Sequence, residues 1–132
     1  MALGIVCRSA YQQDAWPKGF TGFAIAAAAI GATEELVYRG YIQGRLASWG
    51  APAAVAGAAF AHAAYKLAVF LGGPSGVHVN YLFLALATFL GGLALGGLRW
   101  VTRSVVPPVA FHVAFDIVLY GDRLEAPWWV WG

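Results

Sequence analysis

The chain has 132 residues, of which 61% are hydrophobic and only 11% are charged, and its mean hydropathy is +0.67. Soluble domains carry about 25% charged residues, so this composition excludes an ordinary soluble globular protein. The net charge is +2, with eight basic and six acidic residues and no basic run, which argues against a nucleic-acid-binding protein.

Four apolar stretches are long enough to be membrane-spanning helices, which need about 20 residues. The first covers residues 20–48 and carries charges only in its second half. The second begins at Pro52, which suits the first turn of a helix because proline has no amide hydrogen to leave unpaired there, and it stops near Gly72. The third covers residues 79–100, and the fourth begins near Ser104 and ends around Gly121.

The linkers between these spans are short, so neighbouring helices are predicted to be antiparallel. We therefore expect an all-α fold, a polytopic membrane helical bundle with about four core transmembrane helices, in a single domain over residues 1–132. The protein would be a multi-pass integral membrane protein, in the plasma membrane if bacterial. The Gly92–Gly96 spacing is typical of close helix packing, and the tryptophan-rich tail 127–131 is typical of an interfacial anchor.

Six ionisable residues lie inside the predicted spans: Glu34, Glu35, Arg39, His62, His112 and Asp116. A charged side chain at membrane depth costs about 2.5–3.5 kcal/mol on insertion scales, so six of them require partners or a water-filled cavity. Counted at about 1.5 Å per residue, the acids and histidines fall in one layer of a hydrocarbon core about 30 Å thick. Three spans therefore contribute acid–base groups at one depth, which predicts a polar site inside the bundle.

The spacing within the spans predicts how these side chains pair. Glu35 and Arg39 are four residues apart with the acid first, which is the favourable order for a helical ion pair, and we interpret them as structural support for the site. His112 and Asp116 have the same spacing, so each is predicted to orient the other. Glu34 lies about 100° around the helix from Glu35 and points to a different neighbour.

Glu34 is the strongest candidate for chemistry, because the residue one turn later is Tyr38 and no basic partner is evident in the sequence. Lys66, near the end of the second span, is predicted to extend its ammonium group to the membrane interface. His62 has two interpretations: a member of the site, or a histidine that only bonds a backbone carbonyl. If the site is real, Glu34, His62 and His112 should converge in one polar cavity.

The order of three motifs resembles that of a known family. Residues 34–39 are EELVYR, an EExxxR sequence; His62 follows in the second span, and residues 112–116 are HVAFD, an HxxxD sequence. In this order and spacing, residues 20–121 resemble the CAAX-protease and bacteriocin-processing family, also called the Abi family, which includes the type II CAAX prenyl endopeptidases. The match is specific because its motifs lie on separate spans. It implies an intramembrane endopeptidase.

The resemblance also implies roles for the residues at matching positions. Glu34 would be the general base that activates a water, while His62 and His112 would polarise that water or stabilise the oxyanion. Asp116 matches a catalytic position that is Asn or Asp in the family. An ionised Asp cannot donate to an oxyanion as Asn would, so Asp116 would either orient His112 or stay protonated. Glu35 with Arg39 would support the site. The family's second motif is FxxxH. Here Ala58 stands four residues before His62, and Phe60 stands two before it.

A general base and an oxyanion donor inside the membrane fit hydrolysis of a peptide bond presented from the bilayer. The expected partners are the lipid bilayer and a membrane-embedded or membrane-anchored peptide, with a prenylated CAAX protein as one form and no nucleic acid. No cofactor is expected, because HExxH is absent and Cys7 is the only cysteine. If a metal takes part, it would be zinc held by Glu34, His62 and His112 with one open position.

The same buried cluster also fits a second class of protein. Buried Glu and His chains serve as proton relays, so a proton or ion carrier is one alternative, and a non-catalytic membrane immunity or scaffold protein is another. A role in bacteriocin self-immunity, which the family includes, could coexist with proteolysis. A carrier of this size would usually show repeated halves, which this sequence lacks, and a scaffold would not need an unpaired Glu34.

Overall fold

The computed structural model describes residues 5, 8–9, 15–72 and 79–122, and all regular structure in this part of the chain is helical. The first predicted span is a continuous helical run made of α2 (Gly22–Glu35), the π-helical stretch η1 (Leu36–Ile42), α3 (Gln43–Leu46) and the 3₁₀ turn η2 (Ala47–Trp49). The other three spans are α4 (Ala51–Leu71), α5 (Tyr81–Thr102) and α6 (Val106–Tyr120). The all-α prediction is confirmed, and the predicted aromatic tail lies outside the described residues.

Local sequence explains where these helices begin and end. Gly50 has φ +87°, a conformation that favours glycine, and it makes the turn between η2 and α4. The Asn80 side chain accepts a hydrogen bond from the Phe83 amide at 3.0 Å and so caps the start of α5, as asparagine commonly does. Arg103 has φ +53° and ends α5 before the prolines in the first turn of α6.

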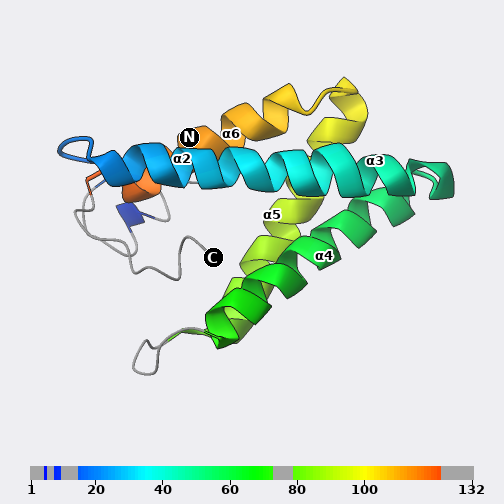
Figure 1. Cartoon of the computed structure of the whole chain (residues 1–132), viewed down its shortest axis with the longest axis horizontal. Coiled ribbons are helices and arrows are strands. Elements are labelled where there is room, and N and C mark those ends of the chain that lie inside the picture. The colour runs from blue at the N-terminus through cyan, green and yellow to red at the C-terminus, as the bar shows by residue number, and fades with distance from the viewer. Residues whose placement is uncertain (1–4, 6–7, 10–14, 73–78, 123–132) are drawn as a thin grey trace.

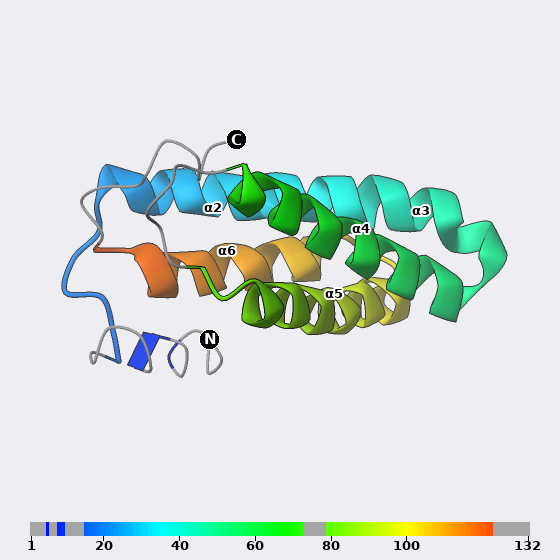
Figure 2. The ribbon, with the colours of Figure 1, turned by 90° about the horizontal axis from the view of Figure 1, so that it is seen from below.

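Consecutive helices run in opposite directions, as the short linkers predict. α2 packs along α6 and α4 packs along α5 (Figure 1). α4 crosses below the first span so that it meets η1 and α3 near its start and diverges from the first span farther along (Figures 1 and 2). The polar part of the first span thus faces α4, and its apolar part faces α6.

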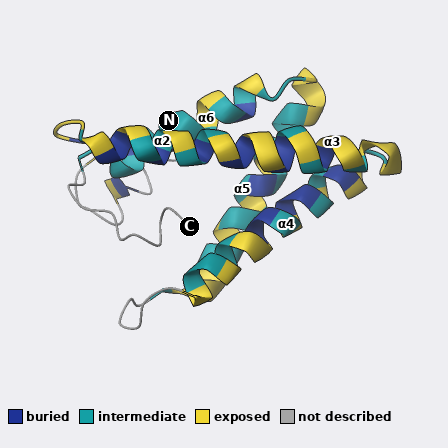
Figure 3. Ribbon diagram, in the orientation of Figure 1, coloured by how far each residue is buried: buried dark blue, intermediate teal, exposed yellow. Residues whose placement is uncertain are grey.

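Two of the helices, α4 and α5, are long and apolar enough to cross a membrane, and α6 is a shorter apolar helix. On α5 the buried residues are two glycines, whereas large apolar side chains are exposed along it, including Leu82, Phe83, Leu86 and Leu90. Figure 3 shows that exposed and intermediate residues make up most of the surface of the helices. An exposed apolar face of this size would be unfavourable in water and is what contact with lipid requires.

Gly92 and Gly96 are the buried residues of α5, and they set how closely α5 approaches its neighbours. A Cβ placed on Gly92 would lie 2.9 Å from the Ala59 Cβ and 3.0 Å from the Arg39 Nη2. A Cβ on Gly96 would lie 3.0 Å from the Val55 Cγ1. The packing role predicted for this GxxxG spacing is therefore confirmed. Gly92 also leaves room for the Arg39 side chain.

Gly92→Ala and its neighbour Gly91→Ala should have opposite effects on stability. Overpacking against the α4 backbone costs about 1–3 kcal/mol, because the added methyl of Gly92→Ala meets both Cα and Cβ of Ala59. Nothing lies within 4 Å of a Cβ on Gly91, so that variant gains up to about 1 kcal/mol of helix propensity. Thermal unfolding midpoints of both variants in detergent check this, and a Gly92→Ala protein as stable as Gly91→Ala would contradict the packing.

A second contact ties the N-terminal segment to the end of α6. Arg8 is only 1% exposed; its Nη2 pairs with Asp122 Oδ2 at 2.5 Å, and its Nη1 lies 3.3 Å from the carbonyl oxygens of Val118 and Leu119. The hydrogen bond from Arg8 and a second one from the Lys18 amide hold the pKa of Asp122 below its ordinary value. Arg8 thus satisfies carbonyls left unpaired at the C-terminal end of a helix.

Candidate active site

A stripe of buried polar residues runs along the first span at intervals of four. Glu35 and Arg39 are 0% exposed and Gln43 is 2% exposed. Four residues overshoot a full turn of an α-helix by about 40°, so such a stripe would drift away from α4 and α5. The π-helical stretch Leu36–Ile42 runs through this stripe, and it turns less per residue than an α-helix because its hydrogen bonds span five residues. The sequence did not reveal this π-helix, which lies at the polar site.

The predicted ion pair is present, and it has more partners than the spacing indicated. Arg39 Nη1 donates to Glu35 Oε1 at 2.8 Å, and the same nitrogen lies 3.1 Å from His62 Nδ1. Gln43, one turn later, donates from Nε2 to the Gly96 carbonyl oxygen at 2.9 Å. These bonds link the first span to α4 and α5 at the level of the site.

Glu34 does point away from Glu35, toward α4. Its Oε2 lies 3.2 Å from His62 Nε2, and its Oε1 pairs with the Lys66 ammonium group. The prediction that Glu34 lacks a basic partner is therefore wrong, and so is the prediction that Lys66 extends to the interface. Glu34 contacts both His62 and Lys66 because these two residues are four apart on α4 and therefore lie on one face of that helix. A paired Glu34 is as compatible with a scaffold protein as with an enzyme.

The contacts of His62 determine which of its nitrogens carries the proton. Arginine only donates hydrogen bonds, so His62 Nδ1 accepts from Arg39 and the proton lies on Nε2, which donates to Glu34 Oε2. The ring also stacks on Tyr38, with centroids 4.5 Å apart and an interplanar angle of 22°. His62 thus joins Glu34, Glu35 and Arg39 in one polar cluster. Its contacts with Arg39, Glu34 and Tyr38 hold the orientation of its ring.

His112 reaches the cluster from α6. Its Nδ1 lies 2.8 Å from Glu35 Oε1, and its Nε2 lies 3.8 Å from Glu34 Oε2 and 3.7 Å from Asp116 Oδ2. The predicted pair of His112 and Asp116 is present at ion-pair distance, but 3.7 Å is too long for a hydrogen bond, and Glu35 makes the hydrogen bond to the ring. A Cβ on Gly31 would overlap Asp116 Oδ2 and lie 3.2 Å from the His112 ring, so Gly31 allows α6 to bring both residues in.

The predicted convergence of Glu34, His62 and His112 is thus confirmed as geometry. The two histidine rings lie 6.3 Å apart, and Glu34 Oε2 lies within 3.8 Å of a nitrogen of each. Three residues were missed as members of the cluster: Lys66, Tyr38 and Gly31. Lys66 could have been found from its spacing of four from His62, whereas nothing in the sequence marks the other two.

The side chains named as candidate zinc ligands have other partners in this structure. The proton on His62 Nε2 leaves that nitrogen no lone pair for a metal, and its Nδ1 is occupied by Arg39. Glu34 Oε1 is occupied by the Lys66 ammonium group. Within the described ranges, no three His, Cys, Asp or Glu side chains are grouped as metal ligands.

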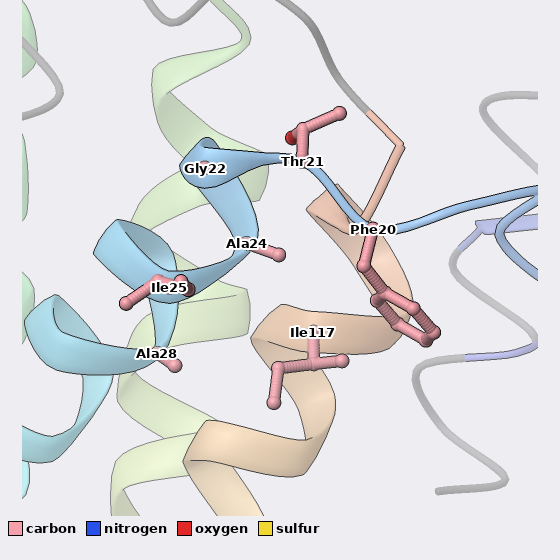
Figure 4. Close-up of a pocket in the computed structure, with 7 residues that line it drawn as sticks. All are labelled: Phe20, Thr21, Gly22, Ala24, Ile25, Ala28 and Ile117. Atoms are coloured by element: carbon pink, nitrogen blue, oxygen red, sulfur yellow. The ribbon is translucent and has the colours of Figure 1, made fainter.

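An open apolar pocket of about 620 Å³ lies apart from this cluster, where α2 begins and α6 ends (Figure 4). It is lined by Phe20, Thr21, Gly22, Ala24, Ile25, Ala28 and Ile117. None of the acid or histidine side chains of the cluster lines this pocket. The residues that line it include no acid–base group.

The family model of type II CAAX prenyl endopeptidase Rce1-like proteins matches residues 16–118, which include every residue of the cluster. The chain belongs to this Rce1-like family. No curated protein and no solved structure matches it. The family is embedded in membranes, in agreement with the two long apolar helices. In this Rce1-like protein Ala58 is 1% exposed and Phe60 is 68% exposed, so Phe60 does not pack in place of the aromatic residue of FxxxH.

Proposed function

We propose that this protein is a multi-pass integral membrane endopeptidase that hydrolyses a peptide bond of a membrane-anchored, prenylated CAAX-type protein. In a bacterium it would act in the plasma membrane. The observation that carries the proposal is the position of Glu34, whose Oε2 faces His62 Nε2 at 3.2 Å and His112 Nε2 at 3.8 Å inside the bundle. A carboxylate between two imidazoles is suited to take a proton from water and to return it.

The first chemical step follows from these distances. Separations of 3.7 and 3.8 Å around His112 Nε2 are too long for direct hydrogen bonds and are suited to a bridging water. Glu34 takes a proton from that water as its oxygen attacks the carbonyl carbon of the scissile bond. The negative charge that develops on the carbonyl oxygen is stabilised by a proton on His112 Nε2, since a donor aimed at developing charge lowers the barrier.

The second step returns the proton. The tetrahedral intermediate collapses, the C–N bond breaks, and the protonated Glu34 transfers its proton to the departing amine. His62 holds the carboxylate from its Nε2–H throughout. Glu35 bonds His112 Nδ1 and so favours the cationic form of that ring, which carries its Nε2 proton before the water attacks and keeps it through the step. Arg39 neutralises Glu35 and fixes the tautomer of His62.

Asp116→Asn combined with a chelator tests the metal-free form of this proposal. Asn keeps the shape of Asp116 and adds an N–H donor near the oxyanion, so the variant should retain activity within about tenfold, far less than the 10²–10⁴-fold expected for loss of a base. Purified wild type and variant are assayed on farnesylated and unmodified CAAX peptides, each with and without chelator. Cleavage should favour the farnesylated peptide and should not respond to the chelator.

Two outcomes would contradict the proposal in different ways. Activity that disappears with chelator and returns with zinc would show that the mechanism requires a metal. If Asp116→Asn then weakened metal affinity by about 10–100-fold, Asp116 would be a residue that supports a metal ligand. A wild-type protein that cleaves neither peptide would instead favour an immunity, scaffold or carrier role for the same cluster.

A further inference from the structure

Lys66 is a charged member of the cluster that the mechanism above does not use. It lies on α4 one turn after His62, and its ammonium group pairs with Glu34 Oε1 while His62 holds Oε2. The two oxygens of Glu34 therefore have different partners from the same helix face. A carboxylate held at both oxygens cannot rotate about its terminal bond, so its plane is set by α4.

Lys66 also differs from the other cation of the cluster in its exposure. The Arg39 side chain is 0% exposed and bonded to Glu35 and His62, whereas the Lys66 side chain is 25% exposed. Glu34 itself is 7% exposed. A buried charge without a partner is costly, so Arg39 belongs to the framework of the bundle. Lys66 lies at the open edge of the cluster, where its contribution to folding is smaller and reagents reach it.

We propose that Lys66 is a positioning residue for the catalytic base. Its ammonium group holds Glu34 Oε1 and thereby aims Oε2 at the water between Glu34 and His112. This inference rests on the proposed function, which it extends by one residue outside the three motifs. Small errors in the position of the Glu34 carboxylate matter, because a misplacement of a catalytic group by about 1 Å can reduce a rate by about 100-fold. Loss of Lys66 should therefore lower kcat and leave KM nearly unchanged, since Lys66 is assigned no contact with the peptide.

The test restores the ammonium group after the protein has folded. Cys7 is the only cysteine, so a Cys7→Ser parent allows Lys66→Cys to be alkylated selectively with bromoethylamine, which rebuilds a lysine-like side chain at that position. We expect Lys66→Cys to lose about 10–100-fold in kcat with KM within about twofold of the parent. Alkylation should recover most of the loss. Ala64→Cys, an exposed position on the same helix, is the matched control and should not respond.

Complete alkylation, verified by mass, without recovery of kcat would overturn the proposal, and so would a Lys66→Cys protein as active as its parent. The pairing is checked without activity by the unfolding midpoints of Glu34→Gln, Lys66→Met and the double variant. Paired residues give non-additive effects, so additive midpoints would also overturn it. A parent that cleaves no CAAX peptide would remove the proposed function itself and the role of Lys66 with it, an outcome distinct from an active parent that is indifferent to Lys66.

Discussion

Glu34→Gln is expected to accumulate as folded protein and to lose about 10²–10⁴-fold in peptide cleavage, the range typical of a general base. The amide keeps the shape of the side chain, and its oxygen can still accept from the Lys66 ammonium group or from His62 Nε2–H. It cannot take a proton from water. Folded yield by size-exclusion chromatography in detergent and kcat on a farnesylated CAAX peptide are the two measurements.

Asp122→Asn is the matched control for this substitution. It makes the same carboxylate-to-amide change outside the cluster, where Asp122 pairs with Arg8 at the end of α6. We expect the kcat of its folded fraction to stay at the wild-type value, while its stability falls because the buried Arg8 loses its carboxylate partner. A Glu34→Gln protein that is well folded and as active as Asp122→Asn would show that Glu34 is not the base.

Arg39→Ala is expected to act on folding before it acts on chemistry. Arg39 and Glu35 are both 0% exposed, and Arg39 Nη1 also bonds His62. Removal of one partner of a buried pair costs about 3–5 kcal/mol, because the remaining charge stays buried. This is a large part of the 5–15 kcal/mol that stabilises a typical folded protein, so folded yield and the thermal midpoint should both fall.

Arg45→Ala provides the comparison for Arg39→Ala. Arg45 lies on the same helical run and is exposed, and surface substitutions of this kind usually change stability by less than about 0.5 kcal/mol. Equal yields and midpoints for the two variants would mean that the Glu35–Arg39 pair does not support the fold. Together, Glu34→Gln and Arg39→Ala separate the acid assigned to chemistry from its sequence neighbour, which is assigned to structure.

The helices and the polar layer could be predicted because membrane depth is encoded locally. Apolar length sets the number of spans, and the cost of a charge at membrane depth makes each internal acid or histidine conspicuous. The spacing of Glu35 and Arg39 predicted their ion pair correctly, since residues four apart share a helix face. The same rule applied to His62 would have identified Lys66. The sequence alone favoured the interface for it, because a lysine near a helix end commonly extends there.

Pairings between helices could not be predicted in this way. His112 and Asp116 share a face of α6, yet His112 Nδ1 bonds Glu35 across the bundle. The group that His112 bonds depends on how closely α2 and α6 approach each other. Gly31 permits the close approach because it leaves room for Asp116 and the His112 ring. The stacking of Tyr38 on His62 depends in the same way on where α4 crosses the first span.

The sequence by itself determined the all-α architecture, the boundaries of the helices to within a few residues, and the common level of the bundle at which Glu34, His62 and His112 lie. These properties follow from apolar length and from the cost of burying charge, which act along one helix at a time. The tertiary structure decided the tautomer of His62, the partner of each Glu34 oxygen and the π-helical stretch between Glu35 and Gln43. These depend on distances between helices, which close packing at Gly31, Gly92 and Gly96 sets.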